Sequence, residues 1–211
     1  MELHPDDILL VIDVQQDFCP GGRLAVADGD AVVPLINTVA AQFEHVILTQ
    51  DWHPPGHVSF ASTHAGKKPF EKTAVDYGEQ TLWPDHCVQG SVGADFHPGL
   101  DIPHAELILR KGFQRDIDSY SAFFENDHCT ATGLAGYLRE RGLQRVFIVG
   151  LAYDYCVRFS AVDAVAQGFR AVVIEDACRA IDLNGSVIET NQAFADLGID
   201  RVQAAALLPR S

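Results

Sequence analysis

Short apolar runs alternate with helical segments along most of this chain, and this alternation restricts the fold more than any other feature. The runs are nearly continuously apolar, which is typical of parallel strands buried on both faces. Six strands are expected, at Ile8–Val14, Val46–Thr49, Leu107–Lys111, Val146–Val149, Ala171–Ile174 and Val202–Leu207. Four helices are expected, at Asp30–Gln42, Thr130–Arg141, from Cys156 to about Gln167, and at Ser186–Leu197. The pattern predicts a three-layer α/β/α fold around a mostly parallel six-stranded sheet.

The stretch from Gln50 to His104 interrupts this alternation. It is rich in His, Pro and Gly and has no clear period. A structureless segment of that length is rare in a compact domain unless it has a function. We therefore expect a long irregular insertion that carries part of a site, within a single domain spanning residues 1–211.

The composition excludes several classes of partner. With 29 acidic against 15 basic residues, the net charge is −14, whereas nucleic-acid binding needs clustered Lys and Arg. No apolar run approaches the roughly 20 residues that a membrane helix needs. The acidic N-terminal segment lacks the order of a signal peptide. The five cysteines form no CxxC pair, which favours free thiols in a reducing cytoplasm.

Four polar residues follow or end the expected strands: Asp13, Asp51, Lys111 and Cys156. In open α/β sheets, ligands bind beyond the carboxyl ends of the strands. Unrelated core or surface residues would have no reason to collect at that edge. The coincidence therefore predicts one site that contains all four side chains.

Cys156 is the expected nucleophile of that site. It lies where a helix should begin, and nearby backbone N–H groups and Lys111 would favour its thiolate form. Asp13 interrupts an apolar strand, and a buried carboxylate is costly unless it is paired, so Lys111 is its expected partner. The pair could move the thiol proton. The alternatives are a buried structural cysteine and a structural salt bridge at the sheet edge.

Asp51, His53 and His86 are the expected metal ligands. The D-x-H spacing places two ligands on one side of an extended segment, because side chains alternate along it. Two His and one carboxylate suit Zn, Fe(II) or Mn(II) and leave positions open for other ligands. His57 is a fourth candidate, and a solvated loop histidine is the equally weighted alternative for it.

Three aromatic residues, Phe18, Trp83 and Tyr120, could wall an apolar slot that accepts a flat ring. The alternative is that they pack in the ordinary core.

Taken together, these residues resemble nicotinamidases of the isochorismatase-like cysteine hydrolase superfamily. The resemblance lies in five stretches that span almost the whole chain: Val11–Phe18, Thr49–Pro55, Leu82–Gly90, Arg110–Gly112 and Val149–Arg158. The Trp-Pro-Asp-His-Cys block within the third stretch points to nicotinamidase in particular.

The resemblance implies a role for each of these residues. Asp13, Lys111 and Cys156 match the catalytic triad; Asp51, His53 and His86 match the metal ligands; Phe18 and Trp83 match the aromatic residues around the ring, and Tyr120 fits less closely. A cis peptide bond is implied before Ala152, whose N–H would form an oxyanion hole with that of Cys156. Tyr153 departs from the small residue that many relatives carry there.

The implied activity is hydrolysis of nicotinamide to nicotinate and ammonia through a thioester, with one divalent metal ion per chain. Hydrolysis of pyrazinamide and a role in NAD salvage are also implied. The alternatives are a relative that acts on a carbamoyl or ureido amide, an isochorismatase, a non-haem iron oxygenase, and a non-catalytic metal-binding domain. The oligomeric state stays open, with a homo-oligomer as one option.

Overall fold

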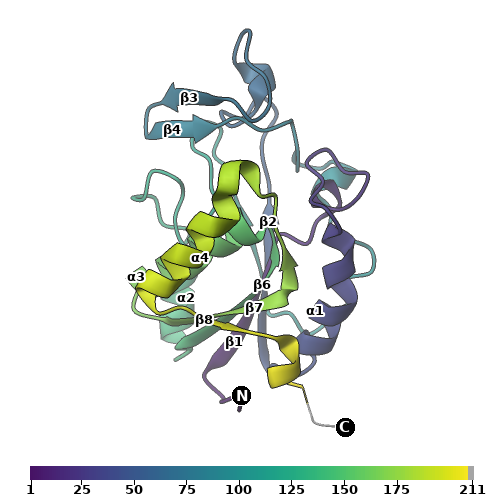
Figure 1. The fold of residues 1–211 in the computed structure, drawn as a ribbon, viewed down its shortest axis with the longest axis vertical. Helices are drawn as coiled ribbons and strands as arrows, with labels where there is room; N and C mark the ends of the chain where they lie inside the picture. The colour runs from purple at the N-terminus through teal and green to yellow at the C-terminus, as the bar shows by residue number, and fades with distance from the viewer. Residues whose placement is uncertain (209–211) are drawn as a thin grey trace.

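The centre of the computed structural model, which describes residues 1–208, is a six-stranded sheet (Figure 1). The strands are β1 (Asp7–Ile12), β2 (His45–Asp51), β5 (Leu107–Lys111), β6 (Arg145–Leu151), β7 (Arg170–Arg179) and β8 (Asp200–Val202). Their order is β5-β2-β1-β6-β7-β8, and all five pairings are parallel. The order reverses between β1 and β6, which creates a crevice at their carboxyl ends.

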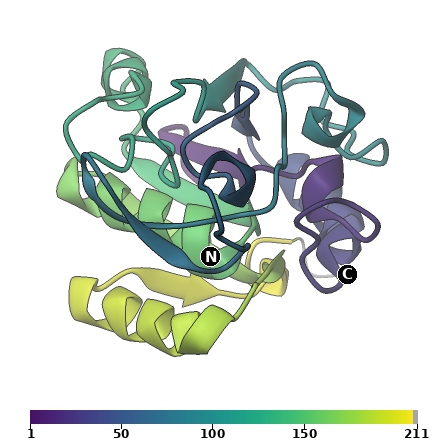
Figure 2. The ribbon, with the colours of Figure 1, turned by 90° about the horizontal axis from the view of Figure 1, so that it is seen from above.

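Helices cover both faces of the sheet (Figures 1 and 2). They are α1 (Val33–Ala40), α2 (Leu134–Glu140), α3 (Arg158–Ala166) and α4 (Ser186–Leu197). The side chains of α1 share one core with Leu9 and Val11, whereas α2, α3 and α4 share the other with Ile8 and Leu10. Successive strand residues thus enter opposite cores, which explains why the strands are apolar throughout. The predicted three-layer α/β/α class is confirmed.

The predicted ends of several elements are wrong. The last strand ends at Val202, and Ala204–Ala206 form a 3-10 turn, as three consecutive alanines favour a helical backbone over an extended one. Residues 130–133 are not helical, because the Thr132 hydroxyl bonds the carbonyl oxygen of Ala122 at 2.6 Å instead. A separate 3-10 turn, Gly29–Val32, precedes α1 where its first turn was expected.

The segment between β2 and β5 contains no α-helix. It holds a two-stranded antiparallel hairpin, β3 (Lys72–Val75) with β4 (Gly78–Thr81), and two 3-10 turns. The hairpin stands beyond the carboxyl ends of the sheet strands, at the top of Figure 1. Within residues 1–208, no helix is long and apolar enough to cross a membrane. A single domain over residues 1–211 stays a prediction, and its last three residues lie outside the described part.

Substitution of Phe147 in β6 can test how tightly this core is packed. Its side chain is fully buried, so replacing it with Ala should leave a cavity and lower the free energy of unfolding by about 3–5 kcal/mol. The half-exposed Phe113 is the matched control, and Phe113→Ala should change that free energy by less than about 0.5 kcal/mol. Denaturant titration measures both, and equal losses would contradict the described core.

Candidate active site

The crevice between β1 and β6 brings the four expected strand-end residues together. Asp51 and Lys111 are the last residues of β2 and β5 and are direct partners in the sheet register. Asp13 immediately follows β1, where its φ of 47° turns the chain back into the site. Aspartate tolerates this left-handed conformation better than most residues. Cys156 lies beyond the end of β6.

The Lys111 ammonium is the centre of this group. It is fully buried, and its Nζ atom lies 2.8 Å from Asp13 Oδ2 and 2.8 Å from Asp51 Oδ1. The same atom donates to the Ser119 carbonyl oxygen at 3.0 Å and lies 3.5 Å from Cys156 Sγ. One cation therefore links the two carboxylates and the thiol.

The charges of this group follow from burial and from these contacts. Burial opposes the charge of Lys111, yet Asp13 and Asp51 raise its pKa well above the ordinary value. Burial raises the pKa of Asp13, with Lys111 acting against it. Burial also raises the pKa of Cys156 well above its ordinary value, despite Lys111. Lys111 lowers that pKa, in the expected direction, but burial outweighs it, and the Cys156 thiol faces both Asp13 and the ammonium.

The thiol belongs to a tight turn between β6 and α3. Tyr153–Val157 form one π-helical turn, so Cys156 lies two residues before α3 begins. The peptide bond between Leu151 and Ala152 is cis, as the resemblance implied. Gly150 precedes it with a φ of 114°, and a Cβ atom there would lie 2.1 Å from the carbonyl oxygen of Ile12. Only glycine allows β6 to approach β1 so closely.

Asp51, His53 and His86 converge on one point. The Asp51 Oδ2 atom lies 3.1 Å from His53 Nε2 and 3.5 Å from His86 Nε2, and all three side chains are buried. His53 Nδ1 donates to the Gly112 carbonyl oxygen at 2.9 Å, and His86 Nδ1 donates to the Pro84 carbonyl oxygen at 2.8 Å. Carbonyl oxygens only accept, so both rings carry a proton on Nδ1, and each Nε2 faces the Asp51 carboxylate.

A carboxylate and two Nε2 atoms that face one another can hold a cation between them, and carbonyl acceptors behind ligand histidines are typical of metal sites. The cluster suits a divalent metal ion. Without a metal ion, burial opposes the charged form of His53, but Asp51 raises the pKa of this histidine above its ordinary value. Burial likewise opposes the charge of Asp51, but His53 and Lys111 lower the pKa of this carboxyl well below its ordinary value. Gly112 is needed here as well, because a Cβ atom would lie 2.5 Å from the His53 ring.

His57 lies beside this cluster with both ring nitrogens engaged. Its Nδ1 is 2.7 Å from the Ser59 hydroxyl and its Nε2 is 3.2 Å from the Ile117 carbonyl oxygen. The ring stacks on His53 at 4.2 Å between centroids, and its Nδ1 or Nε2 also lies within 4.8 Å of a His53 nitrogen and an Asp118 oxygen. Burial and the neighbouring His53 lower its pKa to about 4. His57 is therefore a buried neutral side chain and not a solvated loop histidine.

The three expected aromatic residues all line a small cavity of about 20 Å³ that adjoins the thiol and the metal cluster. Trp83 Nε1 donates to the Tyr120 hydroxyl at 3.0 Å, and Phe18 packs edge-on to His86 at 5.5 Å. The cavity is also lined by Ala152, Cys156, Asp51 and His86 and by four residues that the sequence did not suggest: Leu24, Asp118, Tyr155 and Ile181.

Contacts between distant segments also hold the site, through residues that were not among the predicted ones. The Gln15 amide pairs with the Asp51 backbone through both its oxygen and its nitrogen, each at 2.8 Å. The Thr49 hydroxyl donates to Asp13 at 2.6 Å. Gln15 follows Asp13 by two residues, and Thr49 precedes Asp51 by two. This shared spacing at two neighbouring strand ends was the sequence signal from which both contacts could have been predicted.

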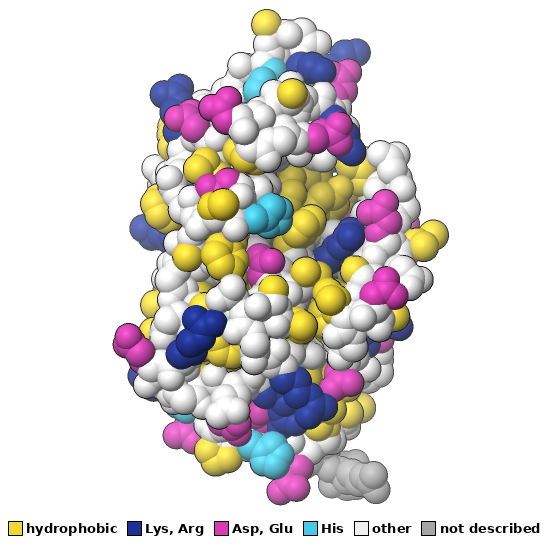
Figure 3. All heavy atoms as spheres, turned by 90° about the vertical axis from the view of Figure 1, so that its left-hand side faces the viewer, with side chains coloured by type: hydrophobic (Ala, Val, Ile, Leu, Met, Phe, Trp, Pro, Cys, Tyr) yellow, Lys and Arg dark blue, Asp and Glu magenta, His cyan; other side chains and the backbone are white. Residues whose placement is uncertain are grey.

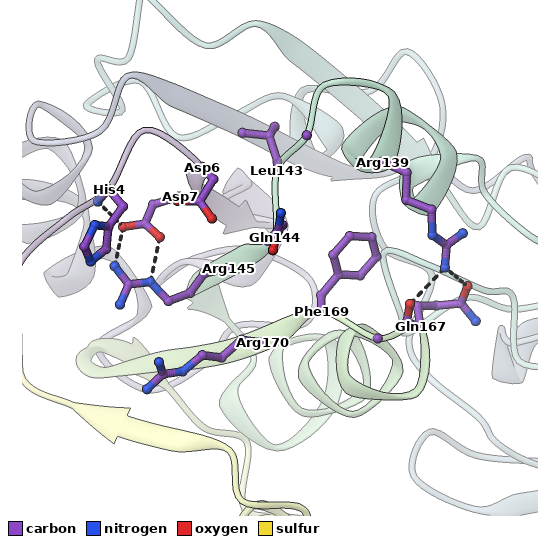
Figure 4. A pocket seen from close by; sticks show the side chains of 12 residues that line it. His4, Asp6, Asp7, Arg139, Leu143, Gln144, Arg145, Gln167, Phe169 and Arg170 are labelled. Carbon is purple, nitrogen blue, oxygen red and sulfur yellow. Dashed lines mark hydrogen bonds and ion pairs between the residues drawn. The ribbon is translucent and has the colours of Figure 1, made fainter.

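A larger cavity, about 690 Å³, lies at the other end of the sheet (Figure 4). Its three arginine side chains are already engaged: Arg145 with Asp7, Arg139 with Gln167 and Arg170 with Asp200. It contains no thiol and no group of metal ligands. The chemistry of the described chain is therefore concentrated at the carboxyl ends of the strands.

Comparison with known proteins identifies the family. The model of the isochorismatase domain matches residues 7–200. The chain belongs to the isochorismatase family. Nicotinamidase of Acinetobacter baylyi is 53% identical over 200 residues, which cover 95% of this chain and 94% of that protein.

Two solved structures extend the comparison. A nicotinamidase/pyrazinamidase of Acinetobacter baumanii has a TM-score of 0.97 and 56% identity, covering 98% of this chain and all of that one. A pyrazinamidase of Pyrococcus horikoshii in complex with zinc has a TM-score of 0.78 and 34% identity, and the match covers 94% of this chain and 99% of that one.

The metal cluster predicts a measurable difference between two histidines. His86→Ala removes one of three donors and should weaken zinc binding by at least about 100-fold, since loss of an outer partner alone costs about 10–100-fold. His104→Ala, at an exposed histidine, should leave zinc binding unchanged. Chelator competition and metal analysis of the purified variants measure this. Equal zinc affinity in the two variants would exclude this cluster as the site.

Proposed function

We propose that this chain is a nicotinamide amidohydrolase, which converts nicotinamide and water to nicotinate and ammonia and also accepts pyrazinamide. The observation that carries the proposal is the buried Cys156 thiol beside Asp13 and Lys111, facing an aromatic cavity that ends at a metal-ligand cluster. The likeness to nicotinamidases over nearly the full length supports the same activity.

The first half of the reaction forms a thioester. Asp13 takes the proton from the Cys156 thiol while Sγ attacks the amide carbon, and Lys111 holds the Asp13 carboxylate throughout. The oxygen of the tetrahedral intermediate accepts hydrogen bonds from the N–H groups of Ala152 and Cys156. Each such donor typically contributes about 3 kcal/mol to the barrier reduction. Asp13 then gives its proton to the leaving nitrogen, the C–N bond breaks, and ammonia departs.

The second half releases the acid. Asp13, again ionised, takes a proton from water while the water oxygen attacks the thioester carbon. The C–S bond breaks, the proton returns to sulfur, and nicotinate forms. The proton that sulfur loses in the first half is the one that the leaving group needs, and Asp13 carries it between them.

Asp51, His53 and His86 would hold the divalent metal ion, as zinc, iron or manganese. When bound, the ion would accept the ring nitrogen of the substrate in an open coordination position. Phe18, Trp83 and Tyr120 would enclose the faces and edges of the ring and exclude water. These groups together orient the carboxamide toward Cys156.

The alternative activities account for less of this arrangement. A metal oxygenase would give no task to a thiol held 3.5 Å from a buried ammonium. A non-catalytic metal-binding domain would not need the costly burial of Lys111. Relatives that act on carbamoyl or ureido amides generally lack the metal ligands, and an isochorismatase does not need the thiol.

The cellular setting is part of the same proposal. The product suits a step of NAD salvage. A cytoplasmic location fits five unpaired cysteines. Small molecules are the expected partners, without nucleic acid or membrane, and a homo-oligomer stays a prediction.

Loss of the thiol gives the decisive test of this function. Cys156→Ala should lower ammonia release from nicotinamide by at least about 10⁴-fold, because the covalent step is removed. Nicotinate binding, measured by calorimetry, should persist because the aromatic and metal-ligand side chains are unchanged.

Cys129→Ala is the matched control, since Cys129 is the exposed cysteine of the five. It should keep full activity and stay sensitive to iodoacetamide, which should abolish ammonia release both in this variant and in the unmodified chain. Ammonia release by the Cys156→Ala variant at a normal rate would overturn the mechanism. Absence of ammonia release from the unmodified chain would overturn the proposed function.

A further inference from the structure

The strand residues of the β3–β4 hairpin are exposed or half-buried, with one exception. Lys72, Ala74, Gly78 and Glu79 are exposed, whereas Gln80 is 1% exposed. Gln80 thus points from a polar surface hairpin into the body of the protein. A fully buried amide at such a position needs partners, since an unpaired one is costly.

The partners of the Gln80 amide are the walls of the candidate site. Its Nε2 atom donates to Asp118 Oδ2 at 2.7 Å and to the Thr81 carbonyl oxygen at 2.7 Å, and lies 3.1 Å from the Tyr120 hydroxyl. Its Oε1 atom accepts from the Tyr77 hydroxyl at 2.9 Å and lies 3.4 Å from Asn126 Nδ2.

These contacts leave the amide a single workable orientation. Turning it over would place Oε1 against the Asp118 carboxylate and Nε2 against the Asn126 amide nitrogen. Acceptor would then face acceptor, and donor would face donor. The Tyr77 hydroxyl reinforces this orientation, because it also accepts from the Asp118 N–H group at 3.2 Å. The hairpin therefore fixes both the carboxylate and the backbone of Asp118.

Two of the residues that Gln80 contacts line the substrate cavity, namely Asp118 and Tyr120. The Tyr120 hydroxyl also accepts a hydrogen bond from Trp83 Nε1. Gln80 is therefore connected through Tyr120 to Trp83, a second aromatic residue of the cavity. An outer cavity of about 330 Å³ between the hairpin and helices α3 and α4 shares Tyr120 and Tyr155 with the inner one. Figure 3 shows a hollow with hydrophobic side chains on this side of the molecule.

We propose that Gln80 is a positioning residue for substrate binding, which holds Asp118 and Tyr120 at the spacing that accepts the aromatic ring. This role depends on the proposed function, because the ring is that of the proposed substrate. Gln80 touches neither the thiol nor the metal ligands through any hydrogen bond of the described residues. Its loss should therefore affect substrate affinity and leave the reacting groups intact.

Gln80→Met is the first variant, because it keeps length and removes every donor and acceptor of the amide. The KM for nicotinamide and the dissociation constant of nicotinate should both rise by about tenfold or more, as expected for loss of a hydrogen bond to a charged group. The kcat and the rate of Cys156 alkylation by iodoacetamide should stay near those of the unmodified chain. Glu79→Gln, on the same strand and exposed, is the matched control and should change none of the four values.

Gln80→Glu keeps the shape of the side chain and serves where Gln80→Met fails to fold. It replaces the donor that faces Asp118 with a second carboxylate, so it should raise the KM further than loss of the hydrogen bonds alone. Combining the Gln80 substitution with Tyr120→Phe tests whether Gln80 acts through the Tyr120 hydroxyl. If it does, the Gln80 substitution should raise the KM less in the Tyr120→Phe background than in the unmodified chain.

The outcomes separate this role from a purely structural one and from the function itself. An unchanged KM and nicotinate affinity in folded Gln80→Met or Gln80→Glu would overturn the positioning role. Parallel loss of kcat and alkylation rate would overturn it as well, since that result means general disruption of the site. Absence of ammonia release from the unmodified chain would instead refute the proposed function.

Discussion

The ion pairs of Lys111 are the interaction on which the site depends. A fully buried ammonium is costly, and it persists here because two carboxylates and a carbonyl oxygen surround it. One of the carboxylates faces the thiol and the other belongs to the metal-ligand cluster. A single cation therefore joins the group that would perform covalent chemistry to the group that would orient the substrate. Removing it would leave Asp13 with only the Thr49 hydroxyl and Asp51 with only the two histidines of the metal cluster as side-chain partners.

The parallel sheet explains how residues so distant in the sequence reach that cation. Asp13, Asp51 and Lys111 come from three adjacent strands whose carboxyl ends meet at one edge, and Cys156 follows the strand across the reversal in strand order. Two glycines make this close meeting possible: Gly150 where β6 passes β1, and Gly112 against the His53 ring. The fold thus sets the distances, and the loops supply the side chains that enclose the cavity.

The sequence predicted most of this arrangement because its signals are local. Apolar runs gave the strands, and polar residues at their ends gave Asp13, Asp51, Lys111 and Cys156. The strand predicted over Val202–Leu207 ends at Val202 instead. Its later part was predicted wrongly because three alanines count as apolar residues but do not favour an extended backbone.

The surroundings of these residues could not be predicted, because they depend on distances between separate loops. Asp118, Tyr155, Ile181 and Gln80 meet the site only through such contacts. The effect of burial on Cys156 could not be predicted for a related reason: burial raises the pKa of the thiol more than the nearby ammonium lowers it, and burial cannot be read from sequence spacing.

The central claim is that this buried thiol carries the acyl group between two half-reactions. Hydroxylamine competes with water for an acyl-enzyme, so product analysis with added hydroxylamine tests the claim directly. Nicotinamide and an ester of nicotinate should then give nicotinohydroxamate and nicotinate in the same ratio, because both substrates would pass through one thioester at Cys156. A ratio that differs between the two substrates, or no hydroxamate from either, would contradict the shared covalent intermediate.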